Sequence, residues 1–296
     1  MSGPILKDIM ARVAADIERE LDRLLSPTDT VPPRLLEAMR YACLEAGKRF
    51  RPILVHAGAA LGHVDRASIT RVGAAIELVH CYSLVHDDLP AMDDAELRRG
   101  KPSVHRQFGE ATAILAGDAL NALAMEVLAR ADWPAAAPLR LELVVGLGRA
   151  AGAAGMCGGQ MLDLESSSER LLSEEELVQL QRLKTGALIG FSLEAGARLA
   201  GLDAAALRAL TVYADALGLA FQIRDDLLDL EVGETGKMAG RDAALGRKTF
   251  VTLLGAPAAR ARLIELRQQG WSALSRAKLE TNLLGQLFDF VIDRSS

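Results

Sequence analysis

Residues 84–94 read LVHDDLPAMDD, an apolar run that ends in four carboxylates within eight residues. Pro90 predicts that a helix ends or breaks here, because proline lacks an amide hydrogen and clashes with the preceding turn. Asp87 and Asp93 would lie about 120° apart on an ideal helix. Both can serve one ion only if the chain curls back through residues 89–92. We therefore expect a broken helix end at this point.

A second acidic cluster lies at residues 221–229, which read FQIRDDLLD. Asp225 and Asp229 are four residues apart and share one helix face. Carboxylates at a helix C-terminus face the negative end of the helix dipole and one another, which costs stability. Solvated acidic helix ends are the alternative, but two such clusters after long apolar helices favour a shared site for hard cations. Mg²⁺ suits such oxygen ligands, with a polyphosphate as the partner.

The composition predicts one all-α domain over residues 1–296. Half of the residues are hydrophobic and a quarter are charged, so the chain can bury a substantial core. Apolar residues recur at three- and four-residue spacing nearly throughout, and strand signals are almost absent. The net charge of −5 argues against nucleic-acid binding.

The sequence also predicts a soluble, cytoplasmic protein without a membrane span. There is no basic and then apolar leader, and the longest apolar stretches, near 72–85 and 142–156, fall short of the ~20 residues that a span needs. The three cysteines are scattered through apolar sequence, which is typical of reduced, buried thiols.

The helical periodicity divides the chain into segments. Ser173 and Glu176 form the pattern of a capping box at the start of one helix, which is expected to carry residues 184–186. Residues 93–107 are expected to form a charged loop, and 231–248 a mobile segment rich in glycine and charge. The main expected helices cover residues 5–25, 33–47, 67–88, 110–130, 137–161 and 203–230.

Basic residues near these helix ends could bind phosphate, since arginine contacts phosphate oxygens bidentately and lysine supplies a point charge. Each one alone could equally be a solvated surface residue. His80 lies two helical turns before Asp87 on the same face, so it is either a core histidine or a ligand. The basic candidates are Lys48, Arg49, Arg51, Arg98, Arg99, Lys101, Lys184, Lys237, Arg247 and Lys248.

Five motifs occur in the order found in trans-isoprenyl diphosphate synthases, and the chain resembles that family over about residues 40–255. They are GKRFRP at 47–52, the first acidic cluster with RRG at 98–100, GQ at 159–160 through Asp163, KTG at 184–186, and the second cluster. The resemblance is greatest to bacterial farnesyl diphosphate synthases, which carry two extra residues where Pro90 and Ala91 stand here. It implies a single helical bundle around a central cavity (the isoprenoid synthase fold) and a homodimer.

The resemblance also implies a ligand set. Asp87 and Asp93 match residues that hold two Mg²⁺ ions, and Asp225 matches the ligand of a third, with Mn²⁺ as a candidate substitute. The matching supporting ligands are Asp88, Asp226 and Asp229. The residues that match the isopentenyl diphosphate site are Lys48, Arg51, His80 and Arg99. Those that match the allylic site are Arg98, Lys184, Thr185, Gln222 and Lys237, with Arg247 in place of a family lysine.

The implied activity is that of a prenyltransferase. It joins isopentenyl diphosphate to the allylic dimethylallyl and geranyl diphosphates and gives farnesyl diphosphate. In the family, an aromatic residue at the position of Tyr82 stops chain growth, whereas ideal helix geometry places Ser83 under Asp87 and turns Tyr82 towards a neighbouring helix. A geranylgeranyl or geranyl diphosphate synthase, or a non-catalytic regulatory subunit of a prenyl synthase, are the alternatives. Arg294 resembles part of a tail that closes over the homoallylic substrate.

Overall fold

A computed structural model describes residues 4–44, 47–166, 172–234 and 249–294. These residues are almost entirely helical, with one two-stranded hairpin, which confirms the predicted all-α class. They divide into two compact units. The N-terminal unit contains Asp8–Gly148 and Ala195–Gly201, and the C-terminal unit contains Met1–Lys7, Arg149–Glu194 and Leu202–Ser296. A single domain over 1–296 stays a prediction.

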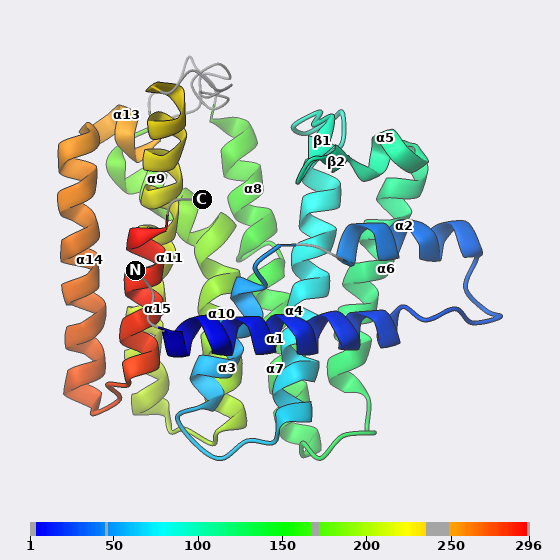
Figure 1. The fold of residues 1–296 in the computed structure, drawn as a ribbon, viewed down its shortest axis with the longest axis horizontal. Helices are drawn as coiled ribbons and strands as arrows, with labels where there is room; N and C mark the ends of the chain where they lie inside the picture. Colours follow the sequence, from blue (N-terminus) through cyan, green and yellow to red (C-terminus); the bar gives the residue numbers. More distant parts are fainter. Residues whose placement is uncertain (1–3, 45–46, 167–171, 235–248, 295–296) are drawn as a thin grey trace. The chain divides into compact units, whose positions relative to one another are not determined.

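Helix α4 is the centre of the N-terminal unit. It packs against α6, α3 and α2, as Figure 1 shows. Twelve of its residues are buried, half of them alanine, valine or leucine, so it is apolar nearly all round, as expected of a core helix. The helices are α1 (Pro4–Leu24), α2 (Pro33–Cys43), α3 (Phe50–Ala59), α4 (Arg66–Asp87), α5 (Val104–Phe108), α6 (Glu110–Ala129) and α7 (Ala137–Ala151).

The end of α4 confirms the predicted break. The helix stops at Asp87, and the chain curls back so that the amide of Asp93 donates to the carbonyl of Asp87 at 2.9 Å. The amide of Ala95 likewise donates to the carbonyl of Asp88 at 3.1 Å. Two residues that are distant on an ideal helix are therefore adjacent here.

The expected charged loop over 93–107 is wrong in part. It contains the antiparallel strands β1 (Leu97–Arg98) and β2 (Lys101–Pro102), followed by the short helix α5. Arg99 and Gly100 both have positive φ, at 54° and 78°. Two consecutive residues with left-handed backbone fit the right-handed twist of a hairpin with a two-residue turn. An arginine at the first turn position is not the usual residue there, so the sequence gives little indication of the hairpin.

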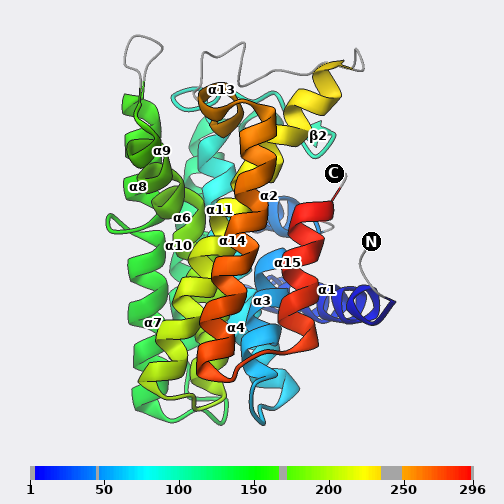
Figure 2. The same cartoon turned by 90° about the vertical axis from the view of Figure 1, so that its left-hand side faces the viewer.

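Helix α11 (Ala204–Glu234) is the centre of the C-terminal unit. It packs most extensively on α14 and also contacts α15 and the π-helical segment η1, as Figure 2 shows for α14 and α15. The other elements are α8 (Met156–Glu165), α9 (Glu174–Gln181), η1 (Arg182–Gly186), α10 (Ala187–Leu199), α13 (Phe250–Leu254), α14 (Ala256–Ala277) and α15 (Asn282–Asp293). The predicted capping box of Ser173 and Glu176 is present at the start of α9.

The single helix expected over 137–161 is wrong. Helix α7 ends at Ala151 and α8 begins at Met156. A Cβ atom on Gly155 would lie 2.2 Å from the carbonyl oxygen of Ala150, so the turn brings backbone against backbone. Only glycine fits this close approach, and apolar periodicity does not report it.

Two helices have the length and composition of membrane spans, Glu110–Ala129 and Ala204–Leu230, each with a mean hydropathy of 1.4. The expectation that every apolar stretch is too short to span is therefore corrected. Both helices pack on other helices of their own unit, and core helices can have the same length and composition. The absence of a membrane span stays a prediction.

Replacing Gly196 with alanine should destabilise the protein. A Cβ atom there would lie 2.0 Å from the carbonyl oxygen of Val55 in α3, and both residues belong to the N-terminal unit, which includes α10 from Ala195 onward. Because backbone must move to admit it, we expect the free energy of unfolding to fall by about 1–3 kcal/mol. Gly148→Ala is the matched control, since no atom lies within 4 Å of its Cβ position. It should leave stability unchanged or raise it by up to about 1 kcal/mol. Urea unfolding of both variants would measure the difference, and equal stabilities would contradict the prediction.

Candidate functional site

Arg49 anchors the basic segment that precedes α3. Its guanidinium is 3% exposed and donates to Glu77 at 2.9 Å, to Glu18 at 2.6 Å and to the carbonyl of Cys43. Burial opposes the charge, but the Glu77 and Glu18 carboxylates raise the pKa of Arg49 above its usual value. Its backbone is left-handed, with φ of 51°. Arg49 is therefore a structural residue that fixes the conformation of this turn.

Arg51, His80 and Arg99, three of the predicted isopentenyl-site residues, lie together in a cationic cluster. Burial and then the positive charges of Arg51 and Arg99 hold the pKa of His80 well below its usual value. Burial likewise lowers the pKa of Arg51, whose Nε has no hydrogen-bond partner among the described residues. A buried guanidinium N–H without a partner is costly unless a ligand supplies one. Lys48, the fourth predicted residue, is exposed.

The first acidic cluster surrounds Arg98. Asp88 is 2% exposed and accepts hydrogen bonds from both Nε and Nη2 of Arg98. Burial lowers the pKa of Arg98, but the carboxylates of Asp88, Asp87 and Asp93 raise it overall. The structure thus brings these three predicted ligands together around one cation.

Asp94, His105 and Arg106 hold the turn that carries Asp93. Asp94 has a positive φ of 42°, and its carboxylate lies 3.2 Å from Nη2 of Arg106 and 3.7 Å from Nε2 of His105. His105 is buried, and its Nδ1 is 3.0 Å from the hydroxyl of Ser103. Sequence reasoning missed these contacts, because no local pattern pairs the turn with α5.

Tyr82 packs beside His86 near the end of α4. Its buried ring meets the ring of His86 edge-on, with centroids 5.6 Å apart. His86 in turn lies against Gly117 of α6, where a Cβ would be 2.1 Å from Nε2. The hydroxyl of Ser83 donates to the carbonyl of His80. The roles of Tyr82 and Ser83 in product length stay predictions.

The second acidic cluster forms a chain of hydrogen bonds in the C-terminal unit. Asp226 is 6% exposed and accepts from the amide of Phe250 at 2.7 Å and from Nε2 of Gln222 at 3.2 Å. The hydroxyl of Thr185 lies 3.5 Å from Oε1 of Gln222. Thr185, Gln222 and Asp226, all predicted site residues, are therefore brought together. Asp229 lies one helical turn beyond Asp225 in α11.

Asp225 is paired with Arg294, near the end of the chain. Nη2 of Arg294 lies 2.7 Å from the carboxylate and also donates to the carbonyl of Phe221. The guanidinium stacks 3.7 Å above the Phe221 ring, and Arg224 donates to the carbonyl of Arg294. Within this unit the tail lies on the last turns of α11, and a cation already occupies one predicted metal ligand.

Lys184 lies in the π-helical segment η1, which sequence periodicity missed. Its ammonium is bonded to Asp163, the last residue of the motif that starts at Gly159. A Cβ on Gly159 would lie 2.1 Å from the amide nitrogen of Lys184, so α8 and η1 are in backbone contact. Such π-helical turns are frequent at functional sites.

The donor set of the acidic clusters fits a hard divalent cation, since every predicted ligand is a carboxylate. Among the described residues, however, no three His, Cys, Asp or Glu side chains are already arranged to hold a metal ion. Lys237 and Arg247 lie outside the described residues, as does most of the segment expected to be mobile. The two acidic clusters belong to different units, so their meeting at one ligand stays a prediction.

Residues 32–278 match the family model of polyprenyl synthetases, and the chain belongs to that family. It is therefore a prenyltransferase of all-α fold, and the family implies a divalent metal cofactor. The chain is 43% identical to the farnesyl diphosphate synthase of Escherichia coli K12 over 93% of this chain and 94% of that protein. It is 42% identical to that of Haemophilus influenzae, over 97% of this chain and 98% of that one.

Solved structures of similar proteins have the same fold as this chain. The FPP/GFPP synthase of Zymomonas mobilis has a TM-score of 0.86 at 42% identity and covers 97% of this chain and 98% of its own. The geranylgeranyl pyrophosphate synthetase of Pyrococcus horikoshii has a TM-score of 0.85 at 30% identity, over 97% and 99%. The resemblance seen in the motifs is thereby confirmed at the level of family and fold.

Stability should depend on the protonation of His80. Because the folded state lowers its pKa, the unfolded chain takes up this proton first as the pH falls below about 6.5. This contribution to stability is fully present above that pH and is lost below it, at up to about 1.4 kcal/mol per pH unit. Urea unfolding at pH 7.5, 6.5 and 5.5 would measure the slope.

His80→Gln should reduce this slope, whereas substitution of the exposed His63 by glutamine should leave it unchanged. An unaltered slope in His80→Gln would mean that the imidazole titrates equally in the folded and unfolded states.

Proposed function

We propose that this prenyltransferase condenses isopentenyl diphosphate head-to-tail with dimethylallyl and then geranyl diphosphate, giving farnesyl diphosphate. The observation that carries the proposal is the cationic cluster of Arg51, His80 and Arg99 beside the acidic end of α4. Basic side chains that protein carboxylates do not neutralise attract a diphosphate. Adjacent carboxylates attract the divalent metal ions that accompany it. Relatives at 43% and 42% identity are named farnesyl diphosphate synthases, which supports this product.

Magnesium is the proposed cofactor, with three ions per site and Mn²⁺ as a substitute. Asp87, Asp93 and Asp225 would hold the ions. Asp88, Asp226 and Asp229 would be supporting ligands, and the first two already accept protein hydrogen bonds that fix their orientation. When bound, the ions would neutralise the charge that develops on the departing diphosphate.

The basic residues would divide between two substrates. Lys48, Arg51, His80 and Arg99 would hold isopentenyl diphosphate, with the neutral imidazole donating a hydrogen bond. The allylic diphosphate would be held by Arg98, Lys184, Lys237 and Arg247. Arg98 and Lys184 are now paired with Asp88 and Asp163, so each would share its donors between a carboxylate and a phosphate.

The reaction needs no nucleophilic side chain. The allylic C–O bond breaks, and its electron pair leaves with diphosphate. The double bond of isopentenyl diphosphate then forms the new C–C bond, and a proton is lost, which the released diphosphate can accept. Thr185 and Gln222 would direct oxygen dipoles at the allylic cation without reacting with it, and water must be excluded.

We also propose a cytoplasmic homodimer. Several large apolar side chains on α6 and α7 are exposed within the N-terminal unit, which supports an interface there. They are Ile114, Leu115, Leu141 and Val145.

Incubation with isopentenyl and dimethylallyl diphosphates, followed by sizing of the dephosphorylated products, tests the proposal. A fifteen-carbon product supports it. A twenty-carbon product would indicate a geranylgeranyl diphosphate synthase, the alternative suggested by the name of the Pyrococcus relative. Absence of any product with Mg²⁺ present would indicate a regulatory subunit.

Substitution of either Asp87 or Asp225 by alanine should lower turnover by about a thousandfold or more, because a lost metal ligand removes several kcal/mol of transition-state stabilisation. Both residues are partly accessible at helix ends, so folding should be retained. Asp118→Ala, at an exposed position on α6, is the control. Chelator should abolish wild-type turnover and Mg²⁺ should restore it. Wild-type turnover in either variant would refute the metal assignment.

Tyr82→Ala should lengthen the products beyond fifteen carbons if its ring limits chain growth. Removing the ring opens space beside His86 below the end of α4. Tyr41→Ala, which removes an aromatic ring on α2, should leave the product ratio unchanged. Chromatography of the dephosphorylated products gives this ratio independently of any loss in rate. A product spectrum like that of wild type would show that Tyr82 is not the floor.

A further inference from the structure

A pocket of about 250 Å³ lies in the N-terminal unit where α1 passes α3 and the first turns of α4. Its walls are largely apolar and include Val13, Ile17, Pro52 and Ile69. One turn beyond Ile69, α4 approaches α1 closely, since a Cβ on Gly73 would lie 2.9 Å from the wall residue Ile17. None of the residues assigned to the prenyl transfer reaction lines this pocket.

Arginines form one side of the pocket. Arg12 and Arg66 line it together with Asp16 and His56. Arg66 binds Asp16 bidentately, at 2.6 and 2.5 Å, and Arg19 pairs with the same carboxylate. Burial and then the charge of Arg12 hold the pKa of His56 below its usual value, so the imidazole is a neutral donor at pH 7.

Arg12 forms no ion pair or hydrogen bond within the described parts of the chain. Three arginines therefore face the single carboxylate of Asp16, and the charge around the pocket is positive.

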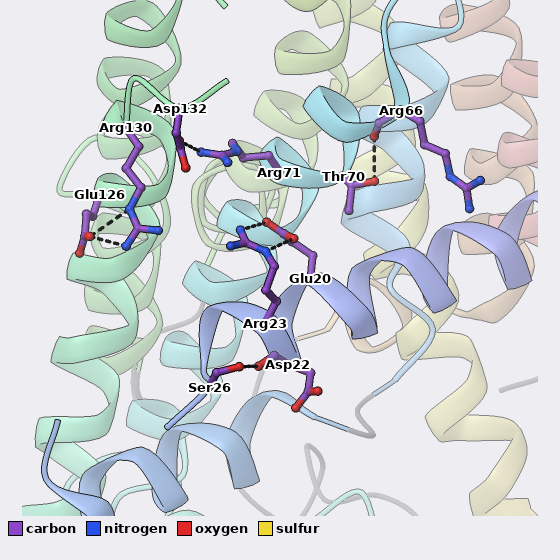
Figure 3. Close-up of polar contacts among 10 residues, drawn as sticks. All are labelled: Glu20, Asp22, Arg23, Ser26, Arg66, Thr70, Arg71, Glu126, Arg130 and Asp132. Atoms are coloured by element: carbon purple, nitrogen blue, oxygen red, sulfur yellow. Dashed lines mark hydrogen bonds and ion pairs between the residues drawn. The ribbon is translucent and has the colours of Figure 1, made fainter. Parts of the chain in front are cut away.

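The neighbouring groove offers a contrast. It shares Asp16, Arg66 and Thr70 with the pocket. Figure 3 shows that two of its arginines are matched by carboxylates, since Arg23 forms two bonds to Glu20 and Arg71 pairs with Asp132. The spare positive charge is thus on the side of the apolar pocket.

We propose that this pocket binds an organic phosphate, with its apolar chain between α1 and α4 and its phosphate on Arg12 and Arg66. A cavity of about 150 Å³ accommodates benzene in another protein, so this pocket accommodates a chain of about five to ten carbons. Arginine offers paired donors to phosphate oxygens, and the neutral His56 adds one more.

An occupant would contact the segment that carries the cationic cluster. Pro52, a wall of the pocket, directly follows Arg51 in the first turn of α3. Glu18, which holds Arg49, directly follows the wall residue Ile17. The site is nevertheless separate from that cluster, and the inference does not depend on the proposed reaction.

Calorimetric titration with octyl phosphate tests the inference, in chelator so that no metal-dependent site contributes. We expect saturable binding of one equivalent. Inorganic phosphate, which lacks the chain, and octylamine, which has the opposite charge, should show no saturable binding at the same concentrations. Failure of octyl phosphate to bind would overturn the proposal.

Variants identify the place of binding. Arg12→Ala should weaken it about tenfold, the effect of one charged hydrogen bond, and Ile69→Trp should abolish it by filling the pocket. Arg23→Ala is the matched control, because it removes the same charge from α1 at a position that lies outside the pocket and pairs with Glu20 rather than Asp16. Arg51→Ala, in the cationic cluster, should also leave binding unchanged.

Thermal unfolding would show whether Ile69→Trp folds, and Thr70→Leu fills the pocket if it does not. Binding that is insensitive to Arg12→Ala and to the filling variants, or that is lost in Arg51→Ala, would place the ligand elsewhere and overturn the proposal.

Discussion

In each unit an arginine neutralises one carboxylate of the acidic cluster. Asp88, the C-cap residue of α4, is paired with Arg98, and Asp225 within α11 is paired with Arg294. Asp88 faces the negative end of the helix dipole, and in both clusters neighbouring carboxylates repel one another. Without the arginines, the 2% exposed Asp88 would be a buried charge with no cation beside it. Each unit can therefore fold with its acidic cluster in place before any other cation binds.

Two arginines in the basic segment at the start of α3, Arg49 and Arg51, have different roles. Arg49 is enclosed by carboxylates from α1 and α4, whereas Arg51, two residues later, has a buried Nε without a partner. A left-handed residue at Arg49 separates the directions of the two side chains. Satisfying the first arginine within the protein leaves the second one available to a ligand. The sequence analysis could not distinguish them, because Glu18 and Glu77 are distant along the chain.

Local chemistry was sufficient for much of the fold. The ends of α4 and α9 follow from Pro90 and from the capping box of Ser173, and both were predicted. The long helices follow from apolar periodicity. The curl after Asp87 was predicted because Asp87 and Asp93 can bind one ion only if the chain turns back between them. The candidate site was predictable to the extent that its residues share a motif or a helix face. Which carboxylate pairs with which basic side chain was not predictable, because tertiary packing determines the partners of Arg98, Lys184 and Arg294.

Two of the remaining errors lie at predicted site residues. Arg98 and Arg99 are in a hairpin that was expected to be a loop, and Lys184 and Thr185 are in a π-helical turn that was expected to be regular helix. In both places the backbone departs from its repeat because of a contact from elsewhere: the Arg99 guanidinium lies on Gly47, and the amide of Lys184 lies against Gly159. Apolar periodicity predicts regular helices whose side chains face either the core or the solvent. It does not predict the local structure where the backbone departs from a regular helix to direct polar groups at a ligand. Locations of failure are therefore informative, and here they coincide with the residues proposed to hold the two diphosphates.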